Sequence, residues 1–163
     1  MKVAICQTKN VIGDLHGNLQ LIQHYVSLAV QNDCDVALFP ELVTTGYPPR
    51  DLLYCDWFWN QHAEVIKKLE IFIKKQPRQI TAIVGGLHQQ QETYGHWSRY
   101  NAAFIISKYH KTIVTHKRLL PCYDVFDETR YFKSSVIDGT PILIKCKNEL
   151  INCDVIICED MWN

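Results

Sequence analysis

Short apolar runs rich in β-branched residues recur along this chain, and they limit it to folds built around a β-sheet. Runs of this kind, bounded by polar or turn-forming residues, are typical of strands. The continuous ones, such as the run that ends at Phe39, are typical of strands buried on both faces. The sequence predicts strands over residues 2–7, 35–39, 80–87, 101–107, 111–116, 141–146 and 152–157.

Two segments between the first three of these runs have helical periodicity instead. In the first, which begins after Asp14, one stripe consists of Leu15, Leu19, Ile22, Val26 and Ala29/Val30. Asp14 is a suitable N-cap, because its side chain can accept a hydrogen bond from the first turn. In the second, over residues 57–75, the buried face consists of Phe58, His62, Val65, Ile66, Leu69, Phe72 and Ile73. Pro77 is expected to mark the end of this second helix.

The order β-α-β-α-β-β-β-loop-β-β mixes helical crossovers with hairpins. Helices segregated from a mixed sheet indicate a layered α/β architecture. Polar residues 89–97 are expected at a hairpin tip, and residues 117–132 form a long loop of a kind that is commonly functional. Because no helical pattern follows the last predicted strand, we expect one face of the sheet to lack its cover and the chain to associate through it.

Composition narrows the classes of function. A chain of 163 residues with 47% hydrophobic and 21% charged residues fits one folded domain. Seventeen basic residues balance 17 acidic ones, so nothing indicates a nucleic acid or an anionic membrane as partner. No apolar run approaches the ~18 residues of a membrane span, and we do not expect MKVAICQT to act as a signal peptide. Seven scattered cysteines predict a reducing, cytoplasmic location.

Three chemically complementary residues follow predicted strands: Glu41, Lys117 and Cys158. Ligands of open α/β sheets bind outside the carboxyl ends of strands, so we expect these side chains to meet. A cation near Cys158 would lower the pKa of its thiol and stabilise a developing oxyanion. A carboxylate would act as general base and then as general acid. The set therefore fits acyl transfer from an amide or a nitrile.

Spacing alone leaves other interpretations open. A cysteine after an apolar strand is commonly a core residue, and Lys117 could be a solvated lysine. A zinc site could be drawn from Cys146, Cys153, Cys158, His110 and His116, but no C-x-x-C pair or H-x-x-x-H pair supports it. Gly85-Gly86 precedes no helix, so strand packing or a bulge is favoured over a phosphate loop. Asp127, Arg130 and Asp160 are expected to order the site loop through ion pairs.

The sequence segments around these residues resemble those of a known family. FPELVTTGYPPRDLL, RYNAA, HKRLLPCYDVFDETRYF and ICEDMWN together resemble the carbon–nitrogen hydrolase (nitrilase) superfamily, and within it the glutaminase domain of glutamine-dependent NAD synthetases. The resemblance implies an α-β-β-α sandwich and a catalytic set of Glu41, Lys117 and Cys158. It also implies that Tyr47 and Tyr123 line a glutamine site and that Glu128 supports it.

The departure from that family is length. The resemblance implies that residues 1–163 are an incomplete carbon–nitrogen hydrolase domain, truncated shortly after Cys158, with the ATP-dependent synthetase domain absent. The sequence has no SGGxDS-type pyrophosphate loop, so we expect no cofactor for this chain, and ATP and Mg²⁺ would belong to the synthetase domain. The family implies L-glutamine as substrate and a homo-oligomer. The alternatives are a stand-alone amidase and a non-catalytic truncated or assembly fragment.

Overall fold

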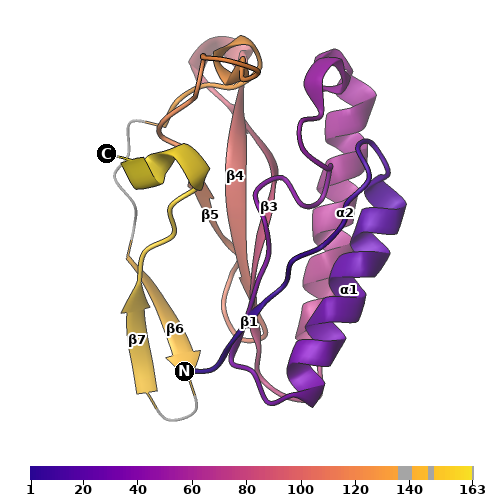
Figure 1. Cartoon of the computed structure of the whole chain (residues 1–163), viewed down its shortest axis with the longest axis vertical. Coiled ribbons are helices and arrows are strands. Elements are labelled where there is room, and N and C mark those ends of the chain that lie inside the picture. Colours follow the sequence, from indigo (N-terminus) through magenta and orange to yellow (C-terminus); the bar gives the residue numbers. More distant parts are fainter. Residues whose placement is uncertain (136–140, 147–148, 163) are drawn as a thin grey trace.

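Five strands form the main sheet of the molecule, in the order β1-β2-β3-β4-β5 (Figure 1). The computed structural model describes residues 1–135, 141–146 and 149–162. β1 (Val3–Ile5), β2 (Val36–Leu38) and β3 (Thr81–Gln91) are parallel, whereas β4 (Trp97–Ser107) and β5 (Ile113–His116) join antiparallel. The sheet is therefore mixed, which confirms the predicted α/β class.

Two helices, α1 (Leu15–Gln31) and α2 (Asp56–Lys74), cover one face of this sheet (Figure 1). Asp14 is the N-cap of α1, and its Oδ1 accepts a hydrogen bond from the Gly17 N–H at 2.8 Å, as predicted. α2 buries Phe58, His62 and Leu69 against the sheet. Burying one large apolar side chain stabilises a fold by about 1.5–3 kcal/mol, so the apolar stripes hold this layer in place.

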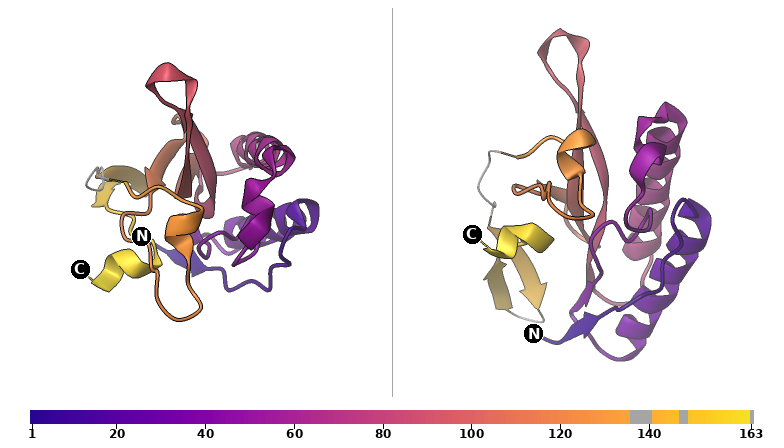
Figure 2. Two further views of the ribbon diagram at one scale, coloured as in Figure 1. Left: turned by 90° about the horizontal axis from the view of Figure 1, so that it is seen from above. Right: turned by 45° about the horizontal axis from the view of Figure 1, so that its top comes forward.

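A second, two-stranded sheet covers part of the opposite face (Figure 2). It consists of β6 (Ile142–Cys146) and β7 (Glu149–Cys153). Its inner side chains contribute to a second core of Val36, Ile83, Ala103, Ile105, Ile142, Ile144, Cys146 and Ile157. The face that we expected to lack a cover is thus partly covered. The outer side of the hairpin is open, with Leu143 58% and Leu150 62% exposed.

The last predicted strand, 152–157, is wrong from residue 154 onwards, and the observed strand begins earlier, at Glu149. β7 ends at Cys153, which pairs with Ile142 at the start of β6, so the following residues have no partner strand. A turn of 3-10 helix, η4 (Cys158–Trp162), follows instead. Val155 and Ile157 still pack on the second core. The apolar run at residues 155–157 therefore reflects burial without strand pairing.

The hairpin of β3 and β4 is longer than predicted. Residues 89–91 and 97–100 are paired, with Gln89 opposite Arg99 and Gln91 opposite Trp97, so the tip is confined to residues 92–96. These outer positions are polar, and the sequence therefore lacks the apolar signal of a strand there. No helix in the described part of the chain is long and apolar enough to cross a membrane.

Candidate active site

Glu41 lies in the turn that follows β2, and this turn packs directly on β3. A Cβ atom at Gly85 would lie 2.4 Å from the backbone nitrogen of Leu42 and 2.5 Å from the carbonyl oxygen of Pro40. Backbone atoms cannot move aside as a flexible side chain would, so only glycine allows this approach. Strand packing, one of the two interpretations favoured for Gly85, is therefore its role, and it places Glu41 at the end of the sheet.

A buried histidine ties the same turn to the helical layer. Nε2 of His62 accepts a hydrogen bond from the backbone N–H of Leu87 at 3.2 Å and lies 2.9 Å from Oγ1 of Thr44. The Thr44 hydroxyl donates to the Gly85 carbonyl at 3.0 Å. Burial lowers the pKa of His62 to about 3, so the ring is neutral and Nε2 stays an acceptor. α2, β3 and the Glu41 turn are thus joined at one point.

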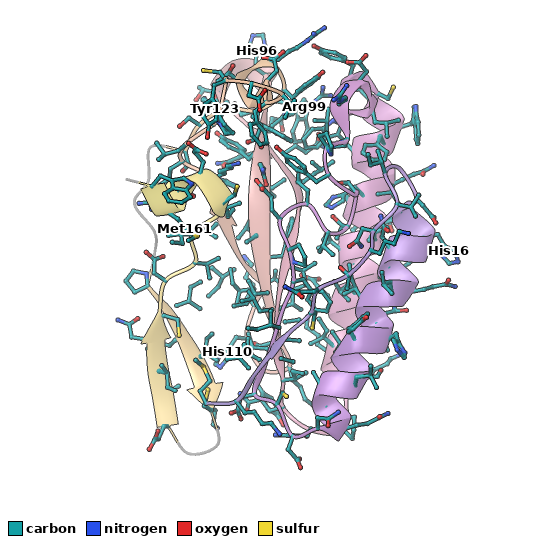
Figure 3. The ribbon with its side chains drawn as sticks, viewed as in Figure 1. His16, His96, Arg99, His110, Tyr123 and Met161 are labelled. Atoms are coloured by element: carbon teal, nitrogen blue, oxygen red, sulfur yellow. The ribbon has the colours of Figure 1, made fainter. Side chains whose placement is uncertain are left out.

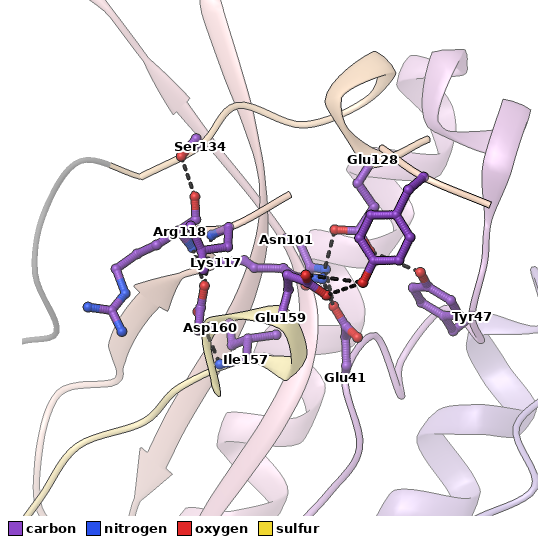
Figure 4. A network of polar contacts seen from close by, with 12 residues as sticks. Glu41, Tyr47, Asn101, Lys117, Arg118, Glu128, Ser134, Ile157, Glu159 and Asp160 are labelled. Atoms are coloured by element: carbon purple, nitrogen blue, oxygen red, sulfur yellow. Dashed lines mark hydrogen bonds and ion pairs between the residues drawn. The ribbon is translucent and has the colours of Figure 1, made fainter. Parts of the chain in front are cut away.

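Lys117 lies directly after β5, and its side chain is fully buried. Its backbone N–H donates to the carbonyl of Asn101 at 2.8 Å, which extends the pairing of β5 with β4. Its Nζ donates to Oε1 of Glu41 and to Oε2 of Glu128, both at 2.8 Å (Figure 4). Lys117 is therefore not a solvated lysine, because two carboxyl groups take the place of water around its ammonium.

The charges of this cluster are mutually supporting. Burial by itself lowers the pKa of Lys117, but its hydrogen bonds to Glu128 and Glu41 outweigh that effect, so the pKa is raised above its ordinary value. Burial raises the pKa of Glu128, against the opposing effect of the Lys117 ammonium. Lys117 is therefore a permanent cation at neutral pH, suited to stabilising negative charge that develops beside it.

Cys158 opens η4 in a left-handed backbone conformation, with φ +47°. Cys158 and Glu41 line one small cavity of about 90 Å³ between the end of the main sheet and the segment 155–158. The structure thus brings the predicted cysteine and carboxylate to the same cavity, from segments far apart in sequence. As a residue, Cys158 is exposed.

Asp160 connects the cysteine turn to the lysine segment. Its Oδ1 accepts hydrogen bonds from the backbone N–H groups of Arg118 and Leu119 at 3.0 and 2.8 Å (Figure 4). Its Oδ2 accepts one from the backbone N–H of Ile157 at 3.1 Å. Asp160 does order the loop through backbone hydrogen bonds, and among residues 1–135, 141–146 and 149–162 it does not form the expected ion pair. Asp127 and Arg130 do form one, at 3.9 Å.

The expectation that Lys117 lowers the pKa of the Cys158 thiol is wrong in its net effect. Burial and the negative charge of Glu41 raise that pKa, and the Lys117 ammonium only partly offsets them. The physical reasons are burial first and then the balance of charges, because one cation is shared by two carboxyl groups. Cys158 therefore rests as a thiol, and a reaction at its sulfur would need a base to remove the proton.

The two predicted tyrosines donate hydrogen bonds to different carboxylates. The hydroxyl of Tyr47 donates to Oε1 of Glu128 at 3.0 Å, and both residues line a larger cavity of about 460 Å³. Tyr123 is exposed and its hydroxyl donates to Glu159, next to Cys158, at 2.9 Å. Figure 3 places Tyr123 towards the upper end of the molecule and His110 lower down. The rings of Tyr47 and Tyr123 both contact Phe126, with ring centroids 6.4 and 5.7 Å apart, so the two tyrosines lie on either side of this one side chain.

One residue of the site, Asn101, was not singled out from the sequence. Asn101, inside the RYNAA segment, donates from Nδ2 to Oε1 of Glu41 at 2.6 Å. A polar residue at the start of an apolar strand run was the available signal.

For the zinc alternative, no group of three or more metal-binding side chains is arranged around a common point within residues 1–135, 141–146 and 149–162.

Comparison with known proteins gives a consistent picture. Residues 2–163 match the carbon-nitrogen hydrolase family. The chain is 37% identical over 163 residues to the glutamine-dependent NAD(+) synthetase of Synechocystis sp. and 31% identical to that of Thermotoga maritima. These alignments cover 99% and 100% of this chain but 28% and 26% of the relatives. The chain thus spans about a quarter of the length of the curated relatives, matching their N-terminal part.

Solved structures agree with the sequence matches. A glutamine-dependent NAD+ synthetase from Acinetobacter baumannii superposes with a TM-score of 0.75 at 29% identity, over 98% of this chain and 28% of that one. An amidase from Nesterenkonia sp. superposes with a TM-score of 0.68 at 18% identity, over 93% of this chain and 54% of that one, which shows a shared fold alone. With its family match over residues 2–163, the chain belongs to the carbon–nitrogen hydrolase family.

Proposed function

We propose that this chain carries the glutamine-hydrolysing site of a glutamine-dependent NAD synthetase. The observation that supports it most is the buried ammonium of Lys117, which Glu41 and Glu128 hold at 2.8 Å each beside the cavity that Glu41 shares with Cys158. A fixed cation, a carboxyl group and a thiol at one cavity are the parts that hydrolysis of an amide requires.

Hydrolysis would proceed in two stages. Cys158 attacks the carbon of the glutamine carboxamide, and Glu41 takes the thiol proton as the S–C bond forms. Lys117 stabilises the oxyanion. The C–N bond then breaks, and Glu41 gives the proton to the departing ammonia. In the second stage water attacks the thioester with Glu41 as base, glutamate leaves, and the proton returns to the sulfur of Cys158.

The tyrosines and Glu128 would bind the substrate. Tyr47 and Glu128 line the larger cavity of about 460 Å³ that lies beside the charged cluster. Tyr123 contacts Phe126, which lines the same cavity, and its hydroxyl donates to Glu159 beside Cys158. We assign Tyr47, Tyr123 and Glu128 to glutamine binding, and we assign no metal ligand.

The ammonia would serve a second domain. We propose that residues 1–163 form part of a glutaminase domain that works with an ATP-dependent synthetase domain, which converts deamido-NAD to NAD. ATP and Mg²⁺ would bind in that synthetase domain. Assembly as a homo-oligomer and a cytoplasmic location belong to the same proposal. Its support is the match to NAD synthetases over the whole of this chain.

Ammonia release from L-glutamine by the purified chain tests the glutaminase. We expect release from the unaltered chain and from Cys153→Ala on β7, and none from Cys158→Ala. Release from small aliphatic amides but not from glutamine would favour the amidase alternative. No release from a folded preparation would favour a non-catalytic fragment.

A further inference from the structure

Asn101 contacts both partners of the central ion pair. It lies in β4, is 1% exposed, and its main-chain carbonyl accepts the backbone N–H of Lys117 at 2.8 Å. Its side-chain Nδ2 donates to Oε1 of Glu41 at 2.6 Å (Figure 4). One residue of the sheet thereby sets the position of the lysine backbone and of the glutamate side chain.

The hydrogen bonds to Glu41 are not distributed evenly between its two oxygens. Oε1 accepts from Nδ2 of Asn101 and from Nζ of Lys117. With both of these donors on Oε1, the other oxygen, Oε2, is the one left to take up a proton. Two donors on a single carboxylate oxygen also fix the rotation of the carboxylate, which a single lysine contact would not.

The orientation of the Asn101 amide follows from its surroundings. A reversed amide would set Oδ1 against Oε1 of Glu41, and two acceptors at 2.6 Å repel each other. With Nδ2 on Glu41, Oδ1 is buried without a hydrogen-bond partner among the described residues. An orphaned buried acceptor destabilises a fold, so packing alone does not explain an asparagine at this position.

We propose that Asn101 is a positioning residue that holds Glu41 with Oε2 turned to the substrate. This inference rests on the proposed glutaminase function. Without Asn101, the carboxylate would keep its bond to Lys117 and rotate about it. Proton transfer from Cys158 and to the departing ammonia would then lose its alignment, whereas the glutamine pocket around Tyr47 would be unchanged.

Asn101→Leu separates this role from a structural one. It removes the hydrogen bond to Glu41 together with the orphaned carbonyl at similar side-chain size. We expect kcat for glutamine hydrolysis to fall by roughly tenfold or more, with KM changed less than about twofold and the urea midpoint of unfolding near that of the unaltered chain. An unchanged kcat would overturn the proposal. A fall in kcat accompanied by a clear fall in the urea midpoint of unfolding would overturn it as well.

Asn101→Asp adds a signature that a structural role would not produce. A second carboxylate beside Glu41 makes the two groups share one proton, so the acid limb of the pH–rate profile should move up by about one unit. Asn152→Asp, which adds the same charge at an exposed position of β7, is the matched control and should leave the limb in place. An acid limb that stays in place in Asn101→Asp contradicts the inference.

A readout without turnover separates failure of this inference from failure of the proposed function. The rate at which iodoacetamide alkylates Cys158, followed by mass spectrometry of its peptide, should have a higher pH midpoint in Asn101→Asp than in Asn152→Asp. If the unaltered chain releases no ammonia but this shift is found, the glutaminase proposal fails and the position of Asn101 at the site stands. Equal midpoints in the two variants overturn the role of Asn101 whatever the activity.

Discussion

Three ionisable side chains act on the thiol of Cys158, and two of them are carboxyl groups. After burial, the negative charge of Glu41 is the largest influence raising the thiol pKa, and Glu128 adds to it. The Lys117 ammonium acts in the opposite direction. The site therefore favours a neutral thiol at rest, and its reactivity depends on how these three groups balance.

The pH dependence of Cys158 alkylation tests this balance. We expect a midpoint above the ordinary thiol value of 9.0 in the unaltered chain. Glu41→Gln removes a negative charge and should lower the midpoint, whereas Lys117→Met removes the positive charge and should raise it. Glu149→Gln on β7 is the control and should have no effect. A midpoint well below 9.0, or shifts of the opposite sign, would contradict this account.

At the scale of elements, Asp160 holds η4 against the segment that follows β5. Its carboxylate accepts three backbone N–H groups, from Arg118, Leu119 and Ile157. It is 5% exposed, so water competes little for these hydrogen bonds. The distance between Cys158 and Lys117 is therefore set by a side chain that is itself outside the chemistry.

Asp160→Ala should separate the two catalytic segments. We expect a loss of roughly 2–4 kcal/mol in the free energy of unfolding, because hydrogen bonds to charged groups are worth ~1.5–3 kcal/mol each and some are regained with water. Glutamine hydrolysis should fall more than this stability loss explains. Asp154→Ala, at an exposed position shortly before η4, should change either quantity little. Full activity in Asp160→Ala would rule out the positional role.

The stability of the fold depends on pH through buried histidines, one of which is His62 on α2. The pKa of His62 in the fold is lowered to about 3 by burial, and that of His116 to about 4, against ~6.5 in an unfolded chain. The contribution of these histidines to the free energy of unfolding is complete above pH ~6.5. As the pH falls below that value, the unfolded state takes up protons that the folded state does not, and stability is lost.

Urea unfolding between pH 7.5 and 4.5 measures this effect. Burial also lowers the pKa of His88, so three histidines contribute, each by up to about 1.4 kcal/mol per pH unit below ~6.5. In His62→Gln the slope should fall by the share of one histidine, roughly a third, even if the variant is less stable at every pH. His110→Gln, at an exposed turn position, should leave the slope unchanged. A stability that stays constant down to pH 5 would show that the folded state binds these protons.

The elements that sequence could predict are those whose signal is local. Both helices have a continuous apolar stripe and a marked end, Asp14 for one and Pro77 for the other, and each was placed to within a few residues. The segment 154–157 contains an apolar run typical of a strand but has no partner strand, and pairing is not local information. The role of Asn101 could not be predicted for the same reason. It depends on Asn101 in β4 lying opposite Lys117, which follows the neighbouring strand β5.

The whole molecule consists of a helical layer, the main sheet and a smaller hairpin layer (Figure 2). Most of the core lies between the helices and the sheet, whereas the hairpin of β6 and β7 rests on the smaller second core. Segments with few buried apolar contacts open more readily than the rest of a fold. The hairpin layer should therefore open before the main sheet does.

Native-state hydrogen exchange of Ile144→Ala tests this order. Ile144 is 3% exposed and faces the main sheet, and its truncation should cost about 2–5 kcal/mol where the layers meet. We expect protection to fall in β6 and β7 and to be retained in β3 and β4. Leu143→Ala, on the open side of β6, is the control and should change little. Equal loss of protection in both sheets would mean that the two layers unfold as one unit.

The hydrogen bonds of the charged cluster join segments that are remote in the chain. Glu41 and Lys117 are 76 residues apart, Glu41 and Asn101 60, and Asp160 reaches back 42 residues to Arg118. Contacts of such sequence separation require the closure of long loops, so they form late in folding. During synthesis on the ribosome the cluster can form only after nearly all of these residues have emerged. Ammonia release would thus begin only with a folded chain, and unfinished copies would leave the glutamine of the cell untouched.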